Sequence, residues 1–174
     1  SGLQSLALVR PPNRARSGTM DIEQLIQAVQ SLRNDDAFRP RLDLAQWRSF
    51  SNYLALETVR PGSLVIRQGE VDRSAYLLGS GSLQVYVEGA FPGTTRAVML
   101  RPGSLVGEVG LFSAGPRTAQ VEAMTSCDLW VLRLPRFEEM CMRQPQLAVE
   151  VTRAAGAVMA VRLRTHLQNN LAVA

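Results

Sequence analysis

The sequence predicts a mainly β domain with helices at both ends, in which eight strands form a jelly roll, or double-stranded β-helix. One observation is a change of hydrophobic period, because apolar residues recur at helical spacing up to about residue 55 and in short alternating or apolar runs after it. Another is the turn spacing, since Pro-Gly and Gly-Ser-Gly turns separate these runs by roughly 8 to 12 residues. Helical signals return after Pro135.

The N-terminal third divides into an arm and a helical part. Residues 1–19 are expected to be a disordered arm or a remnant of cloning, because they combine a Pro-Pro pair with three arginines and a Ser-Gly-Thr run. A signal peptide is not expected, since the arginines follow the short apolar stretch instead of preceding it. Residues 20–55 are assigned to two helices, one beginning at Asp21 as its N-cap and one over residues 42–53.

Residues 56–134 are assigned to the jelly roll, and residues 135–174 to a hinge with two C-terminal helices. About eight strands fit the runs LETVRPGSLVIRQGE, SAYLLGSGSLQVYVEG, TRAVMLRPGS, TAQVEAM and CDLWVLRL. The hinge is placed at Gln144-Pro145, because proline ends one helix and can begin the next. The apolar face of the last helix, which runs to about Asn170, is expected at Leu147, Val151, Ala155, Val158 and Leu163.

Composition excludes several kinds of chemistry. All nineteen basic residues are arginine, so a phosphate-binding lysine, a Schiff-base lysine and a lysine general base are excluded. The formal charge of +4 falls by three without the arginines of the N-terminal arm, which leaves no basic face for nucleic acid. The single histidine, His166, is expected on an exposed helix surface, and no metal site is expected around it. Cys127 and Cys141 are expected to be reduced core thiols.

The stretch LVGEVGLFSAGPRTAQVEA at residues 105–123 holds two charges in an apolar segment. Burial of Glu108 and Arg117 without partners would cost about 3 kcal/mol or more each, so each needs a partner. They could pair with each other in a structural salt bridge. The glycines at 107 and 110 favour a ligand instead, because they remove side chains where a ligand could approach backbone N–H groups.

The chemistry of these residues fits a nucleotide. A short helical turn beginning near Gly107 would favour an anion at its positive end, and Arg117 offers a fork of donors to phosphate oxygens. Glu108 can only accept hydrogen bonds at pH 7, so its natural partner is a sugar hydroxyl. Thr118 can offer a hydroxyl to the phosphate or to a purine edge. The pattern leaves no nucleophile, base or metal ligand, so an enzyme is not expected.

The stretch resembles the phosphate-binding cassette of the cyclic nucleotide-binding domain family. That pattern is Gly-Glu, an apolar pair, a short variable piece, then Pro-Arg, a small residue and Ala, here within residues 106–119. Roughly residues 40 to 170 share the similarity, including the turns at Pro61-Gly62, Gly69-Glu70 and Gly79-Ser80-Gly81. The resemblance implies a cAMP or cGMP pocket without a metal, with ligand-binding residues Val106, Gly107, Glu108, Val109, Arg117, Thr118 and Ala119.

The resemblance further implies Glu108 on the ribose 2′-hydroxyl, Arg117 on the cyclic phosphate and the last helix as a lid. Val98, Leu105 and Val106 are expected either in the wall around the base or in the core. Val158 and Arg162 share one face of the last helix, so both are expected at the mouth of the pocket, with a solvated surface role as the alternative for Arg162. In this family a hydroxyl at the position of Thr118 can help to accept a syn guanine, but activator-type members with a hydroxyl there use cAMP, which favours cAMP over cGMP.

The expected function is a bacterial regulatory domain in signal transduction, in which nucleotide binding moves the C-terminal helix and controls an effector by allostery. The alternative is a degenerate jelly roll that binds no nucleotide and dimerises through its last helix. Expected partners are the nucleotide, a fused or associated membrane transporter or channel, and a second copy of the chain. No helix-turn-helix pattern follows the last helix, so direct nucleic-acid binding is not expected. The expected location is the cytoplasm, also if the domain is the soluble module of a membrane protein.

Overall fold

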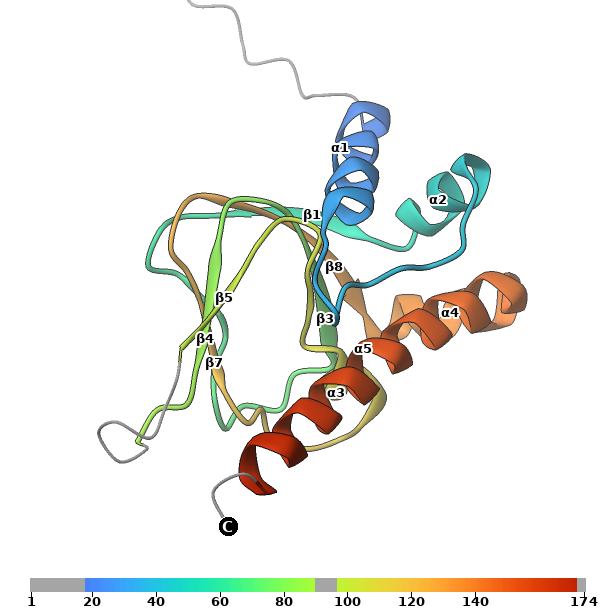
Figure 1. Cartoon of the computed structure of the whole chain (residues 1–174). Coiled ribbons are helices and arrows are strands. Elements are labelled where there is room, and N and C mark those ends of the chain that lie inside the picture. The colour runs from blue at the N-terminus through green and yellow to red at the C-terminus, as the bar shows by residue number, and fades with distance from the viewer. Residues whose placement is uncertain (1–17, 90–96, 172–174) are drawn as a thin grey trace, which may run out of the picture.

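A roll of β-strands stands beside a layer of helices, as Figure 1 shows. The structure is a computed structural model that describes residues 18–89 and 97–171. The arm expected over residues 1–19 therefore lies outside the described residues, except for its last two. Residues 18 and 19 belong to helix α1 (Gly18–Ser31), which begins earlier than the helix predicted from Asp21. Asp21 is consequently inside this helix and is not its N-cap.

Helix α2 (Leu44–Ser51) begins at a capping box that the sequence encodes locally. The carboxylate of Asp43 accepts a hydrogen bond from the backbone N–H of Gln46, and the side chain of Gln46 accepts one from the backbone N–H of Asp43. These two bonds satisfy donors that the first helical turn leaves unpaired. The aromatic residues Trp47 and Phe50 are buried in the hydrophobic cluster that the helices share with one face of a β-sheet. The helix is thus shorter at both ends than the predicted range of residues 42–53.

Eight strands form two four-stranded antiparallel sheets, which confirms the predicted mainly β fold. One sheet has the order β1-β8-β3-β6 and the other the order β2-β7-β4-β5. The bounds are β1 (Ala55–Val59), β2 (Leu64–Ile66), β3 (Ser74–Ser80), β4 (Leu83–Tyr86), β5 (Val98–Leu100), β6 (Leu105–Val106), β7 (Gln120–Ala123) and β8 (Cys127–Arg133).

The two faces of the first sheet contribute to two hydrophobic clusters. Leu78, Leu129 and Val131 face the second sheet and pack inside the roll. Leu77 and Trp130 face the opposite way and pack against the helices. Because both faces are covered, β3 and β8 read as continuous apolar runs, whereas a strand with one solvated face would alternate.

The chain ends in α4 (Leu134–Arg143) and α5 (Pro145–Leu171), which Gln144 separates. Helix α5 crosses the helical layer and reaches the end of the roll where α3 (Glu108–Phe112) lies (Figure 1). Two predicted burials are wrong. Cys141 is exposed. Leu163 is 59% exposed, because the part of α5 beyond residue 158 extends past the core.

Candidate functional site

The cassette begins with a left-handed turn at Gly107 that leads from β6 into α3. Strand β6 ends at Val106, and Gly107 adopts the left-handed conformation with φ of 80° as the N-cap of α3. The carbonyl of Gly107 accepts hydrogen bonds from the N–H groups of Gly110 and Leu111. Left-handed backbone favours glycine because it lacks a Cβ. Glu108, the first residue of the helix, therefore enters the site from a fixed turn and is only 4% exposed.

Arg117 is held by three acceptors: a carboxylate oxygen and two backbone carbonyls. One terminal nitrogen, Nη2, donates to Oδ2 of Asp72 at 2.9 Å and to the carbonyl of Ser74 at 2.5 Å. The other, Nη1, donates to the carbonyl of Gly107 at 2.7 Å. The Nε hydrogen of this 8%-exposed residue has no acceptor among the described residues. These contacts use three of the five N–H donors of Arg117, so donors on Nε and Nη1 are left for an additional acceptor.

The pKa of Asp72 is lowered beside Arg117. Burial raises the pKa of Asp72, but hydrogen bonds from Arg117 and Ser74 and the charge of Arg117 outweigh it, so the pKa lies below 3.8. The hydroxyl of Tyr76 donates to the same Oδ2 at 3.1 Å. Burial and the charge of Asp72 raise the pKa of Tyr76 to about 12. The carboxylate of Asp72 thus stays ionised at neutral pH.

The two cassette glycines make room for Arg117, a reason that differs from the approach of a ligand inferred from the sequence. A Cβ at Gly110 would lie 2.2 Å from Nη1 of Arg117 and 2.7 Å from the carbonyl oxygen of Asp72. A Cβ at Gly107 would lie 3.1 Å from the same Nη1. The guanidinium thus packs directly on the backbone of the α3 turn.

Helix α5 closes the other side of the site through Arg162. Its Nη1 donates to Oε1 of Glu108 at 2.9 Å, its Nε to Oδ2 of Asp36 at 2.9 Å, and its Nη2 to the carbonyl of Leu105 at 2.7 Å. Glu108 and Arg117 therefore do not pair with each other. Each has its own partner of opposite charge, from α5 and from the segment before β3 respectively.

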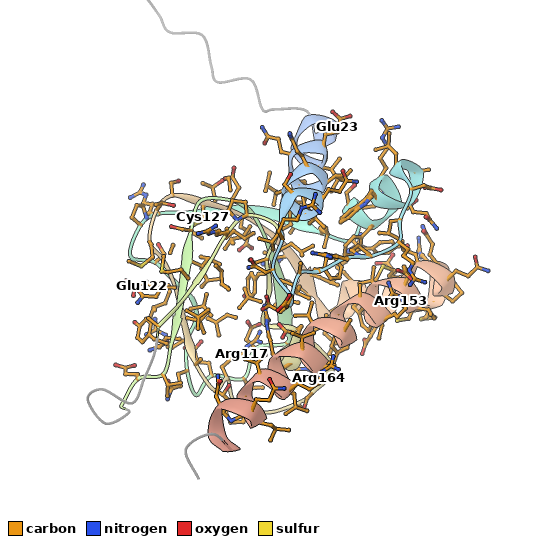
Figure 2. The ribbon with its side chains drawn as sticks, in the orientation of Figure 1. Glu23, Arg117, Glu122, Cys127, Arg153 and Arg164 are labelled. Carbon is orange, nitrogen blue, oxygen red and sulfur yellow. The ribbon has the colours of Figure 1, made fainter. Side chains whose placement is uncertain are left out.

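A cavity of about 420 Å³ lies between the cassette and α5. All seven predicted ligand-binding residues line it, together with Ile66, Val85, Ser113 and Arg162. A neighbouring cavity of about 730 Å³ shares Val85, Val106 and Arg162 with the first. Figure 2 shows Arg117 at the edge of the roll next to α5, while Glu122 and Cys127 lie on the far side of the roll from that helix.

The four residues predicted for the base wall or lid separate into two groups. Val98 lines the second cavity and is 54% exposed, and Arg162 lines both cavities. Leu105 and Val158 belong to the hydrophobic cluster beneath the helices and line neither cavity. Successive strand residues face opposite sides, so Val106 points into the roll and Leu105 towards the helices.

Three polar residues of this region were not predicted from the sequence: Asp36, Asp72 and Arg73. Asp72 and Arg73 precede the buried run of β3. In the sequence, this pair of opposite charges indicates the end of a loop, but it does not indicate which residues the two side chains contact. Arg117 in a desolvated segment requires a carboxylate, and Glu108 is the only acidic residue within residues 106–119. The partner of Arg117 is 45 positions away in the chain, so no local pattern identifies it.

Comparisons with known proteins identify the family. Residues 56–144 match the cyclic nucleotide-binding domain family. The chain belongs to the cyclic nucleotide-binding domain family. Its human relative, potassium/sodium hyperpolarization-activated cyclic nucleotide-gated channel 3, is 37% identical over 94 residues, which cover 54% of this chain and 12% of the channel. The chain thus spans only a small part of that channel's length.

Solved structures of cyclic nucleotide-binding domains share the fold. A domain from Methylobacillus flagellatus superimposes with a TM-score of 0.75 at 16% identity, covering 90% of this chain and 86% of that one. The catabolite activator protein of Thermus thermophilus has a TM-score of 0.66 at 26% identity and covers 76% of this chain and 61% of its own. Domains of this family bind cAMP or cGMP as a regulatory ligand, so the chain is a cyclic nucleotide-binding regulatory domain.

The described residues contain no group of three or more His, Cys, Asp or Glu side chains that could hold a metal ion. Among the same residues, no helix combines the length and the apolar character that crossing a bilayer requires.

Proposed function

We propose that this domain senses cAMP, in preference to cGMP, in the cavity between the cassette and α5. The observation that carries the proposal is the placement of Glu108 and Arg117. These two buried and oppositely charged side chains line one cavity at the positions where the family pattern has its Glu and Arg. An acceptor and a guanidinium in one pocket match a sugar hydroxyl beside a phosphate.

The ribose and phosphate ends of the ligand would use different parts of the cassette. Glu108 would accept the 2′-hydroxyl while it keeps its contact with Arg162, because a carboxylate has two oxygens and about four acceptor sites. The cyclic phosphate would sit between Arg117 and the turn that begins at Gly107. A phosphate also offers the buried Nε of Arg117 an acceptor, although the guanidinium must shift to reach it.

The purine would extend towards the second cavity, past Val85 and Val98. Arg162 lies at the junction of both cavities and uses the edge of its guanidinium for three hydrogen bonds. Edge hydrogen bonds leave the plane of a guanidinium for stacking on an aromatic ring. This arrangement supports a lid in which Arg162 contacts the ligand, so that nucleotide binding moves α5.

The preference for cAMP rests on Thr118, which is exposed and lines the first cavity. Its hydroxyl is the feature that the chain shares with activator-type members. We expect cGMP to bind at least tenfold more weakly than cAMP, a difference of about 1.4 kcal/mol. Tighter binding of cGMP would reverse this assignment.

The effector of the domain is proposed from its relatives. The similarity to the human channel favours a membrane channel or transporter that carries or contacts this domain. Leu163 and Leu167 are exposed on α5 at one-turn spacing, which supports a second copy or the effector as the partner of this helix.

Titration calorimetry with cAMP tests the proposal. Wild-type protein should bind, and Arg117→Ala should lose about 2 to 4 kcal/mol of binding free energy, as for a desolvated charge-assisted contact. Arg133→Ala is the matched control, because Arg133 forms an exposed ion pair with Glu57 and lines neither cavity. Equal affinity of wild type and Arg117→Ala would refute the role of Arg117.

A further inference from the structure

Arg73 contacts the cassette from outside the cavity. It precedes β3, is half-buried, and lines neither cavity. Its Nε donates to the carbonyl of Gly110 at 2.9 Å, and its Nη2 donates to the carbonyl of Leu111 at 2.9 Å. Both acceptors belong to α3, the helix that begins with Glu108. Arg73 therefore holds this helix with two hydrogen bonds from one guanidinium.

A five-residue helix needs such support at its end. The last carbonyl groups of a helix have no partner within the helix, and a cation near them interacts favourably with the helix dipole. In α3 the carbonyl of Val109 accepts from the N–H of Ser113, and the next two carbonyls accept from Arg73. Without that guanidinium, those carbonyls would have to find water or shift.

The backbone of Arg73 is itself fixed. Its carbonyl accepts a hydrogen bond from the N–H of Leu134 at 3.0 Å, where β8 meets α4. The neighbouring Asp72 binds Arg117, as described above. Two consecutive residues before β3 thus anchor the two halves of the cassette, one through the helix end and one through the arginine.

We propose that Arg73 is a positioning residue for nucleotide binding, which orients α3 and so aims Glu108 at the sugar hydroxyl. This inference rests on the proposed function. It predicts that loss of Arg73 weakens the hydroxyl contact specifically. A role in stability alone would change the unfolding temperature and leave the affinity of the folded protein unaltered.

The test compares cAMP with 2′-deoxy-cAMP on Arg73→Gln by calorimetry. We expect a loss of about tenfold for cAMP, the size of one charge-assisted hydrogen bond, and less than about threefold for the deoxy analogue, which lacks the hydroxyl that Glu108 accepts. Arg67→Gln is the control, because Arg67 lies in the same connection and forms an exposed pair with Glu70. It should change neither affinity.

Two results would overturn the inference while the proposed function stands: unchanged cAMP affinity in Arg73→Gln, or equal losses for both nucleotides. Failure of wild-type protein to bind either nucleotide would overturn both. If Arg73→Gln does not fold, Arg73→Lys replaces it. A single ammonium nitrogen cannot reproduce the two-pronged contact, so about a threefold loss for cAMP is expected, and none would overturn the inference.

Discussion

Each charged side chain named above for the proposed nucleotide site has a partner of opposite charge in the absence of ligand. Glu108 pairs with Arg162 and Arg117 pairs with Asp72, both at 2.9 Å. Pairing matters because an uncompensated buried charge costs several kcal/mol. The site can therefore stay folded without nucleotide, with its charged side chains already held beside the cavity.

Asp72→Asn tests the anchor of Arg117. We expect the variant to lose about 2 kcal/mol of unfolding free energy at pH 7, because a hydrogen-bonded charge loses its partner. The folded pKa of Asp72 is lowered, so its contribution is present above pH 3.8 and disappears as the pH falls through the folded pKa. Urea denaturation across this range should show the difference between the two proteins shrinking in acid.

Glu57→Gln serves as the control for Asp72→Asn, since Glu57 pairs with an exposed arginine. Such pairs contribute about 0 to 1 kcal/mol. A loss in Asp72→Asn that is no larger than in Glu57→Gln would contradict the anchoring role.

Gly110→Ala tests the close packing of Arg117 on α3. Alanine favours helix by up to about 1 kcal/mol over glycine. Here the added methyl would collide with the guanidinium and the backbone of Asp72, so we expect a net destabilisation of about 1 to 3 kcal/mol. Gly115→Ala is the control, because nothing lies within 4 Å of its Cβ position. Equal denaturation midpoints for the two variants would refute this packing.

At the scale of elements, α5 divides into a packed half and an exposed half. Its buried side chains, from Leu147 to Val158, belong to the main hydrophobic cluster, while residues 163–169 are exposed. Removal of the whole helix would therefore expose the core. The lid role can be separated from the structural role only by cutting beyond Val158.

Truncation after Val161 makes that separation. The variant should remain folded and bind cAMP ten- to a hundredfold more weakly, about 1.4 to 2.7 kcal/mol, because it lacks Arg162. Truncation after Leu167 keeps Arg162 and should bind within about twofold of wild type. Calorimetry supplies the affinities and thermal unfolding supplies the check on folding. Undiminished binding after the shorter truncation would mean that α5 is not a lid.

Strand positions could be predicted from the sequence because their turns are encoded locally. Gly62, Gly69, Gly81 and Gly103 all adopt positive φ at the predicted turns. The start of α1 could not be predicted from Asp21, because a helix can extend through an acceptable N-cap residue. The exposure of Cys141 depends on how α4 packs, which helical spacing alone does not determine.

At the scale of the whole molecule, the cassette was predictable and its partners were not. Glu108 and Arg117 lie nine positions apart in one motif, whereas Glu108 and Arg162 are 54 positions apart. Only the folded chain brings α5, the loop with Asp36 and the cassette together around the two neighbouring cavities. Helical spacing was also insufficient to place Val158, which shares a helix face with Arg162 and yet lies in the core.

The central claim is that Glu108 accepts the ribose 2′-hydroxyl of a cyclic nucleotide in this cavity. A thermodynamic cycle tests it, with cAMP and 2′-deoxy-cAMP titrated into wild type and Glu108→Ala. Arg162 keeps Asp36 and the carbonyl of Leu105 in that variant, so its charge is not left unpaired.

The account predicts that wild type binds the deoxy analogue about ten- to a hundredfold more weakly than cAMP, whereas Glu108→Ala distinguishes the two by less than about threefold. The same preference for cAMP in both proteins would contradict it.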